Sequence, residues 1–572
     1  MKVDLIIENV KVFNAYFKRF LKSDVAILDG KYFYIGKYKD KLSSKKVING
    51  DNKYMIPGLI DIHMHIESSM ATPNAFSYEL IRNGVTTIVS EPHEIANVFG
   101  VEGIKAMIDA GKDCDIDIFY GVPSSVPSTS SYYETTGAKI DIEEIKELLN
   151  YKNIICLGEV MNYYDVINSN DSKINKLIKF FRKENPHLPI EGHCPKLLDL
   201  DLAKFIYNGV NSDHTQQTKE GMKERIMNGM FIEIQEKSMN EDIINFIIDN
   251  NLYEHVCLVT DDVMADTLIK EGHLNKLVKK AIDMGMSPEN AFYISTFTPA
   301  RRMGLKDRGS IAPGKIADFV LLNDLKDFKI SDVYKKGKKV FDDTYTYDFE
   351  KKNGLFPKRF YESIKLDNIN EKDLKIKAPK KNGQIKCRVI NVKDKSTYTE
   401  EVIKTLDIKD GFLDWENSPY LIIAVFERYN KFGNIGIGLV TGDTIKKGAV
   451  ATTYAHDHHN LLVVGKTITD VLKAVNTVIE NQGGYCVVKD NEILASISLP
   501  VAGILSEESM KIIGEKLLNV RKAMAHLGYK HYNPVMSLST NSLPVSPLLK
   551  ITDKGLVNLS KNRIENLFME GQ

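Results

Sequence analysis

Between residues 55 and 304, short apolar or β-branched runs alternate with amphipathic helical stretches. The eight runs lie at 55–63, 85–90, 116–122, 153–159, 188–193, 209–214, 229–234 and 255–261. Helical segments such as 140–150, 173–183 and 241–251 separate most of them. This alternation predicts parallel βαβ units. Eight strands in a segment of this length favour a TIM-type (β/α)8 barrel, which needs roughly 250 residues, over an open doubly wound sheet.

Strand-like sequence on both sides of this segment indicates a smaller second domain. Residues 1–54 and 305–345 both consist of short apolar runs with turn glycines, and neither is long enough to form a core alone. We expect them to combine into a β-sandwich that flanks the barrel at 55–304. The Lys-rich segment 346–385 predicts a solvated linker, and the mixed pattern of 386–572 predicts a C-terminal α+β domain.

Composition and charge exclude several classes of protein. The 76 Lys and Arg residues balance 76 Asp and Glu residues, so the formal net charge is zero and gives no electrostatic basis for binding nucleic acid. No apolar run approaches the ~20 residues that cross a bilayer, and the N-terminal sequence alternates like a strand instead of resembling a signal peptide. Six scattered cysteines form no CxxC pair and indicate no disulfide framework. We therefore expect a cytoplasmic protein.

Two histidines close the first predicted barrel strand, His63 and His65. Residues i and i+2 of a strand face the same way, so both imidazoles would point into the mouth of the barrel. Such a pair suits a divalent metal ion. A pair of hydrogen-bonded structural histidines is the alternative.

Further ionisable residues stand at the ends of later strands: Glu91 and His93 after the second, Glu159 at the fourth, His193 at the fifth, His214 at the sixth and Asp261 at the eighth. The carboxyl ends of barrel strands converge on one mouth, where active sites lie. Singly, each residue has a structural explanation, such as an ion pair, a satisfied core histidine or a helix N-cap. Together, four imidazoles and two carboxylates can hold two metal ions, namely those of His63, His65, His193, His214, Glu159 and Asp261.

At this point the sequence resembles the amidohydrolase superfamily, through PGLIDIHMHIESSM (57–70), the later ligand-type residues and GSIAPGKIADFVLL (309–322). Many binuclear members bridge their metals with a carbamylated lysine on the fourth strand, whereas this chain has Glu159 there and no lysine near that strand end. That departure, with EPHEIANVFG (91–100), YGVPSSVP (120–127), GAVATTYAHDHHNLLVVG (448–465) and SLPVAGILS (498–506), closely resembles the adenine deaminases along essentially the whole chain.

The resemblance implies an aminohydrolase of purine salvage that converts adenine and water to hypoxanthine and ammonia. It implies two divalent ions per chain, Mn²⁺ or Fe²⁺ with Zn²⁺ also possible, and a homo-oligomer of two or more chains. We expect His63, His65 and Asp261 to bind one ion and His193 and His214 the other. Glu159 would bridge the two ions.

Catalytic and substrate-contact roles follow from the same expectation. Asp261 would act as the general base, and either His214 or His93 would polarise or protonate the substrate. His93 and Glu94 would act in catalysis or contact substrate, with a structural loop cap as the alternative. The expected substrate contacts are Glu91 (where relatives often carry Asp), Ser124, His456 and Asp457. For the cluster 456–459, a lid over the barrel mouth or a substrate contact is favoured over a separate metal site, and a hydrogen-bonded turn is the alternative.

Two other functions remain open from the sequence. The same metal ligands would serve a cyclic amide or amidine hydrolase such as a hydantoinase or dihydroorotase, and a catalytically inactive scaffold could keep the barrel. The cytidine-deaminase type of zinc site needs a PCxxC signature, which the sequence lacks.

Overall fold

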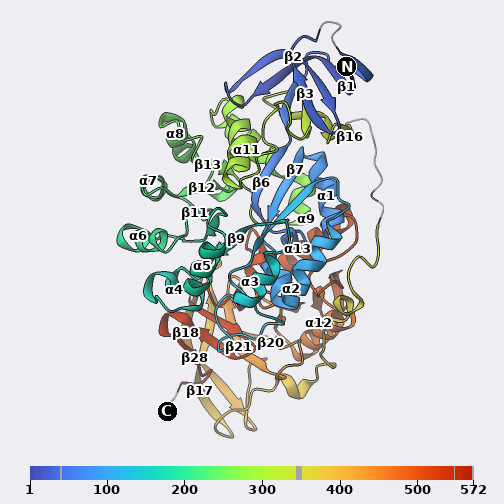
Figure 1. The fold of residues 1–572 in the computed structure, drawn as a ribbon. Helices are drawn as coiled ribbons and strands as arrows, with labels where there is room; N and C mark the ends of the chain where they lie inside the picture. The colour runs from blue at the N-terminus through green and yellow to red at the C-terminus, as the bar shows by residue number, and fades with distance from the viewer. Residues whose placement is uncertain (39–41, 343–348, 350, 547, 570–572) are drawn as a thin grey trace.

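The computed structural model describes residues 1–38, 42–342, 349, 351–546 and 548–569. Figure 1 shows three parts along the long axis of the molecule. The N-terminal strands β1–β3 lie at one end, β17 and β28 lie towards the other, and the central strands and their helices lie between them. None of the described helices is long and apolar enough to cross a membrane.

The first sheet combines the N-terminal segment with residues that follow the central part. Its order is β16-β15-β14-β5-β1-β2-β3, and β4 pairs with β1. The strands are β1 (Lys2–Asn14), β2 (Arg19–Leu28), β3 (Lys31–Ile35), β4 (Ser43–Asn49), β5 (Tyr54–Pro57), β14 (Phe319–Asp324), β15 (Lys329–Lys335) and β16 (Lys338–Asp342). The antiparallel pairing of β5 with β14 joins the two segments. The predicted boundary at 345/346 lies outside the described residues.

The central part contains eight parallel strands in two sheets. The first has the order β10-β9-β8-β7-β6 and the second β11-β12-β13. Their bounds are β6 (Leu59–Met64), β7 (Val85–Ser90), β8 (Asp117–Val122), β9 (Ile154–Val160), β10 (Ile190–Gly192), β11 (Ser212–Asp213), β12 (Phe231–Ile234) and β13 (Val256–Leu258). Each falls within or beside a predicted run. The first begins later than expected because Tyr54–Pro57 pairs with the flanking sheet instead.

Helices follow most of the central strands: α1 (Pro73–Arg82), α2 (His93–Ala110), α3 (Ile142–Leu148), α4 (Tyr163–Asn168), α5 (Lys173–Glu184), α6 (Asp199–Tyr207), α7 (Lys219–Met227), α8 (Glu241–Asp249), α9 (Ala265–Glu271), α10 (Leu274–Asp283) and α11 (Pro288–Arg302). Helix α5 illustrates their local logic. The Ser172 hydroxyl accepts the Asn175 N–H as an N-cap, and Leu177 and Phe181, four residues apart, are buried on one face.

A buried carboxyl group connects the first and last central strands. Thr260, after β13, donates to the Asp61 carboxylate of β6 from its backbone N–H (3.2 Å) and its hydroxyl (2.6 Å). Next to it, the Asp261 N–H donates to the His63 carbonyl at 3.0 Å. Burial raises the pKa of Asp61 to about 7. These bonds bring Asp261 to the same end of the strands as the histidines of β6.

The C-terminal part is an α+β arrangement. Its larger sheet has the order β19-β18-β17-β21-β20-β23-β22-β24-β25, and β26, β27 and β28 form a smaller one. The strands are β17 (Gly383–Val392), β18 (Thr399–Lys409), β19 (Phe412–Leu413), β20 (Leu421–Phe426), β21 (Ile435–Gly442), β22 (Ala449–Thr452), β23 (Leu461–Gly465), β24 (Gly484–Lys489), β25 (Glu492–Ser498), β26 (Leu549–Thr552), β27 (Gly555–Asn558) and β28 (Arg563–Glu565). The helices are α12 (Ile468–Glu480), α13 (Met510–His526) and α14 (Pro534–Ser539).

The segment expected to be a solvated linker, 346–385, packs in part against the rest of the protein. It contains two short 3₁₀ helices, Lys358–Glu362 and Glu371–Leu374. Phe360 is fully buried and its ring stacks on Phe99 of α2, with the ring centroids 4.0 Å apart. The prediction of a solvated linker rested on the many lysines of this segment and gave no weight to its few apolar residues, such as Phe360, which anchor it.

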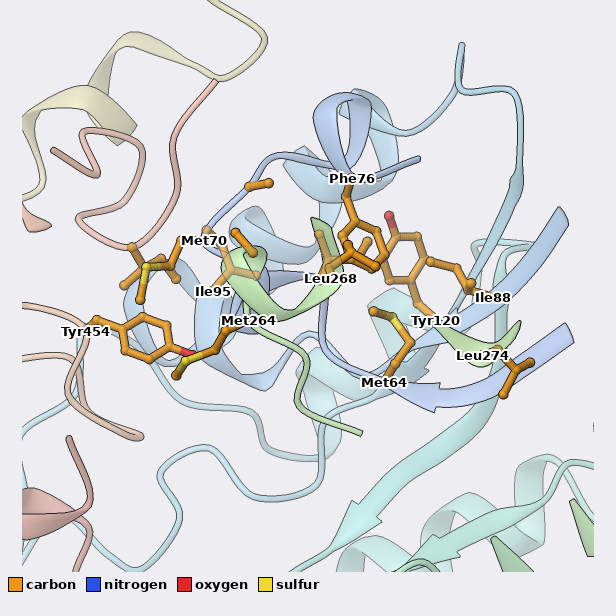
Figure 2. Close-up of a cluster of buried hydrophobic side chains, with 14 of the residues drawn as sticks. Met64, Met70, Phe76, Ile88, Ile95, Tyr120, Met264, Leu268, Leu274 and Tyr454 are labelled. Carbon is orange, nitrogen blue, oxygen red and sulfur yellow. The ribbon is translucent and has the colours of Figure 1, made fainter. Parts of the chain in front are cut away.

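Apolar side chains join the central part to the C-terminal part beside the ends of the strands. Figure 2 shows Tyr454 lying with Met70 and Met264 at one end of a buried cluster. Met64, Ile88 and Tyr120, from β6, β7 and β8, lie towards the other end. Because Tyr454 lies in the loop between β22 and β23, this packing places that loop near the carboxyl end of β6.

Candidate metal centre and active site

The structure brings the six expected metal ligands together at the carboxyl ends of the central strands. Glu159 belongs to β9, and its carboxylate oxygens face several imidazoles. Glu159 Oε2 lies 2.9 Å from His193 Nδ1 and 3.3 Å from His214 Nε2. Its other oxygen, Oε1, lies 3.7 Å from His65 Nε2. The Glu159 carboxylate therefore lies between His193, which follows β10 at one edge of the five-stranded sheet, and His65, which follows β6 at the other edge.

His63 of β6 and His65, which follows the last residue of that strand, complete the cluster. His65 Nε2 lies 3.5 Å from Asp261 Oδ1. On its other side, His65 Nδ1 lies 2.9 Å from the Glu91 carbonyl, which can only accept, so Nδ1 carries the proton and Nε2 is free to bind a metal ion. The His63 ring stacks on His214 with the centroids 3.8 Å apart.

The donor set and its unused atoms fit divalent metal ions. His63 Nε2 and His214 Nδ1 are buried and have no hydrogen-bond partner among the described residues. Ligand-type atoms lie within 4.8 Å of one another in three groups here: His65, Glu91, His93 and Glu159; His63, His65 and Asp261; and His63, Glu159 and His214. Imidazole nitrogens and carboxylate oxygens are the donors expected for zinc, manganese or iron(II). His193 contacts Glu159 and His214 but belongs to none of these groups.

Burial and the neighbouring polar and charged groups together set the protonation states of the cluster. Burial, with the neighbouring His214, lowers the pKa of His63 to about 3, which favours the neutral imidazole that metals bind. Burial opposes the charge of Glu159, but the His193 hydrogen bond and the adjacent imidazoles hold its pKa well below the usual range. In the same way, burial opposes a charge on His65, but Asp261, whose Oδ1 lies 3.5 Å from His65 Nε2, and the surrounding carboxylates raise its pKa well above the usual value.

Glu91 and His93 lie directly beside the six expected ligands. Glu91 Oε2 contacts His93 Nδ1, and the same His93 nitrogen lies 3.8 Å from Glu159 Oε1. The ligand-type atoms of Glu91 and His93 lie within 4.8 Å of those of His65 and Glu159. The donor set around Glu159 is therefore larger than the six residues expected from the sequence. Burial opposes a charge on His93, but Glu91 and Glu94 raise its pKa well above the usual value.

The other expected contact residues also lie at this end of the strands. The Ser124 hydroxyl donates to the Glu159 carbonyl at 2.7 Å, so it is engaged in holding the strand end. His456 Nε2 lies 2.7 Å from Glu94 Oε1, and Asp457 Oδ1 lies 3.9 Å from His93 Nε2. The loop between β22 and β23 thus covers part of the site.

Sequence reasoning missed Glu233, and it named His459 only as a member of the cluster 456–459. Glu233, on β12, is fully buried with Oε2 3.9 Å from His63 Nδ1. Burial and the neighbouring Glu191 raise its pKa well above the usual value. The inward positions of the seventh strand were the available signal for Glu233. His459 contacts Glu94 through Nε2, and the HDHH run was the signal for it.

Comparison with known proteins identifies the family. The model of the amidohydrolase family matches residues 54–340, and that of the adenine deaminase C-terminal domain matches residues 396–563. An adenine deaminase of Clostridium perfringens (strain 13 / Type A) is 56% identical over 575 residues, covering 100% of both chains. The chain belongs to the adenine deaminase family. The resemblance noted from the motifs is therefore confirmed.

A second full-length relative agrees with this assignment to the adenine deaminase family. Adenine deaminase 2 of Shouchella clausii (strain KSM-K16) is 53% identical over 572 residues, covering 100% of this chain and 99% of the relative. Among solved structures, a crystal structure of an enamidase, described as a member of the amidohydrolase superfamily, is 17% identical with a TM-score of 0.45. It covers 61% of this chain and 98% of its own.

Proposed function

We propose that this chain catalyses the hydrolytic deamination of adenine to hypoxanthine and ammonia. The observation that carries the proposal is the 56% identity with a protein named adenine deaminase across the full length of both chains. The buried cluster of imidazoles and carboxylates supplies the chemical groups that such a hydrolysis requires.

The scaffold in this proposal is one closed (β/α)8 barrel. The two sheets of parallel strands have the same direction and the expected strand order. The isolated parallel bridge between Met64 and Asp261 and the hydrogen bonds of Thr260 to Asp61 support closure between the first and last strands. The site then lies at the carboxyl end of the barrel, where the enzymes of this fold have their active sites.

Two divalent ions, Mn²⁺ or Fe²⁺ in preference to Zn²⁺, would be held by six residues. His63, His65 and Asp261 would hold one, His193 and His214 the other, and Glu159 would contact both. When bound, such ions lower the pKa of water so that a hydroxide nucleophile is available near neutral pH. The placement of His65 and His193 on different oxygens of Glu159 supports this division.

The protein's own groups move the protons. Burial opposes ionisation of Asp261, but the facing His65, the other imidazoles of the cluster and Lys237 hold its pKa well below the usual range, so it is ionised at neutral pH. Asp261 can accept the proton of the attacking water and pass it to the leaving amine. His93, which Glu91 and Glu94 keep protonated, is better suited than His214 to donate a proton to a ring nitrogen. Burial lowers the pKa of His214, which favours its neutral form.

Substrate would meet the side of the site formed by α2 and the loop of the C-terminal part. Glu91, Glu94, His456 and Asp457 are buried there around His93. In this proposal they orient the purine ring, and Ser124 keeps Glu159 in place through its hydrogen bond to the Glu159 carbonyl. The cytoplasmic location and the homo-oligomeric state remain predictions from the sequence.

A parallel assay of two reaction types tests the function. Protein purified anaerobically with added manganese is analysed for bound metal and assayed with adenine, hydantoin and dihydroorotate. We expect about two metal ions per chain, conversion of adenine to hypoxanthine in the ultraviolet spectrum and one ammonia per turnover. Ring opening of hydantoin or dihydroorotate without adenine turnover would support the cyclic amide hydrolase instead. Metal binding with no turnover of any of them would indicate a scaffold.

A further inference from the structure

A buried carboxylate of the central part lies against two histidines of the C-terminal part. Glu94 lies in the first turn of α2, and each of its oxygens meets one imidazole from the loop between β22 and β23. Glu94 Oε1 lies 2.7 Å from His456 Nε2, and Oε2 contacts His459 Nε2. Glu94 is 1% exposed and His459 is fully buried.

The two imidazoles are fixed from behind, which orients them towards Glu94. His459 Nδ1 lies 3.2 Å from the Thr453 carbonyl, and His456 Nδ1 lies 2.7 Å from the Ser539 hydroxyl. Since a carbonyl only accepts, His459 Nδ1 carries a proton, and the contact of Nε2 with Glu94 Oε2 is held by a second proton between those two atoms. The ring cannot turn without losing both contacts. Thr453 is itself anchored, because its hydroxyl donates to the Gly503 carbonyl at 2.6 Å.

The oxygen that His459 does not contact, Oε1, lies near both His456 and the proposed proton donor. Glu94 Oε1 lies 3.5 Å from His93 Nε2, while Oε2 points away towards His459. A carboxylate with one oxygen fixed in this way presents the other in a defined direction. Without His459, Oε2 would be buried without its partner, and Glu94 would rotate or take up a proton to avoid that cost.

We propose that His459 is a positioning residue for deamination: it fixes Glu94 so that Glu94 Oε1 faces His93, and the C-terminal part thereby completes the active site. The proposal rests on the deaminase function proposed above. His459 acts through Glu94 and does not touch the reacting atoms. The C-terminal part is then a component of the catalytic machinery and not an accessory domain.

Three variants of the full-length, metal-loaded enzyme test this role. His459→Ala removes the contact, and His459→Gln retains an amide donor near the position of Nε2. His458→Ala removes another fully buried imidazole of the same loop, one whose Nδ1 accepts the Asn460 N–H. We expect His459→Ala to lower kcat for adenine at least about 10-fold with little change in KM. His459→Gln should recover several-fold of that loss, and His458→Ala should lower the Tm with a much smaller effect on kcat.

A double-mutant cycle with Glu94→Gln adds a second measurement. If His459 acts through Glu94, adding His459→Ala to Glu94→Gln lowers kcat by less than about 2-fold. Multiplicative losses, equal kcat for the Ala and Gln variants, or a kcat loss in His458→Ala as large as in His459→Ala would overturn the proposal. If Glu94→Gln has no measurable activity, the comparison of His459→Ala with His459→Gln decides. Absence of adenine turnover in the wild type would refute the proposed function itself.

Discussion

Asp261 and His65 face each other at the carboxyl end of the central strands, with Asp261 Oδ1 3.5 Å from His65 Nε2. The contact depends on the last strand returning to the first, where the Asp261 N–H bonds to the His63 carbonyl. This position suits the two roles proposed for Asp261, ligand to a metal ion and acceptor of a proton from the attacking water.

Replacing Asp261 by Asn removes the proton acceptor while keeping the shape of the side chain. We expect kcat for adenine to fall about 100- to 10,000-fold, the usual contribution of general acid–base catalysis. Hypoxanthine formation measured by absorbance, with metal analysis of the same sample, checks this. Asp283→Asn, on the exposed side of α10, is the control and should match wild type. Adenine turnover at the wild-type rate by Asp261→Asn would rule out the role as base.

Glu159→Gln should lower the amount of bound metal. The glutamine side chain carries no charge. Its amide would present N–H groups to imidazoles that face a carboxylate anion in the wild type. We expect metal content to fall from about two ions per chain to one or fewer, with adenine turnover lost in parallel. Elemental analysis after gel filtration measures it, and Glu147→Gln, an exposed partner of Lys105, is the control. Retention of both ions in Glu159→Gln would contradict the bridging role.

Stability should fall with acidification partly through His458. Burial, with the adjacent His459, lowers the pKa of His458 to about 3. Between about pH 6.5 and pH 3 the unfolded chain protonates this histidine and the folded chain does not, so the free energy of unfolding decreases as pH falls. The slope is at most about 1.4 kcal/mol per pH unit, and the contribution is fully present above pH 6.5.

His458→Asn tests this dependence because its side-chain oxygen can still accept the Asn460 N–H. The Tm of chelator-treated wild type should drop more between pH 7.5 and pH 5.5 than that of the variant. Chelation removes the separate effect of metal release from both proteins. Equal drops in Tm would show that His458 is not kept neutral by the fold.

Asp553 connects the C-terminal sheet to the loop that follows β8. Its carboxylate accepts the Thr135 N–H (2.9 Å) and the Thr135 hydroxyl (2.6 Å), and Asn434 donates to it at 3.1 Å. Asp553→Asn would turn an amide towards these donors and cost about 1–3 kcal/mol. We expect a lower Tm and faster proteolysis within residues 124–139, measured by mass spectrometry. Asp490→Asn, at an exposed turn, should change neither.

Much of the central part could be predicted because its signals are local. Each strand is a short buried run, and each helix repeats its apolar residues along one face, as Leu177 and Phe181 do in α5. His63 and His65 were recognisable as a pair because two residues of one strand must face the same way. The family resemblance followed from contiguous motifs of this kind.

What the sequence alone determined was which groups stand at strand ends and which family the chain belongs to, since both are written in consecutive residues. The tertiary structure decided which groups meet. Glu94 and His459 touch only because the C-terminal part folds over α2. Phe360 anchors the segment 346–385 against α2, although the lysines of that segment had predicted a solvated linker. Contacts between distant residues depend on how whole layers pack, and no local pattern of polarity encodes that packing.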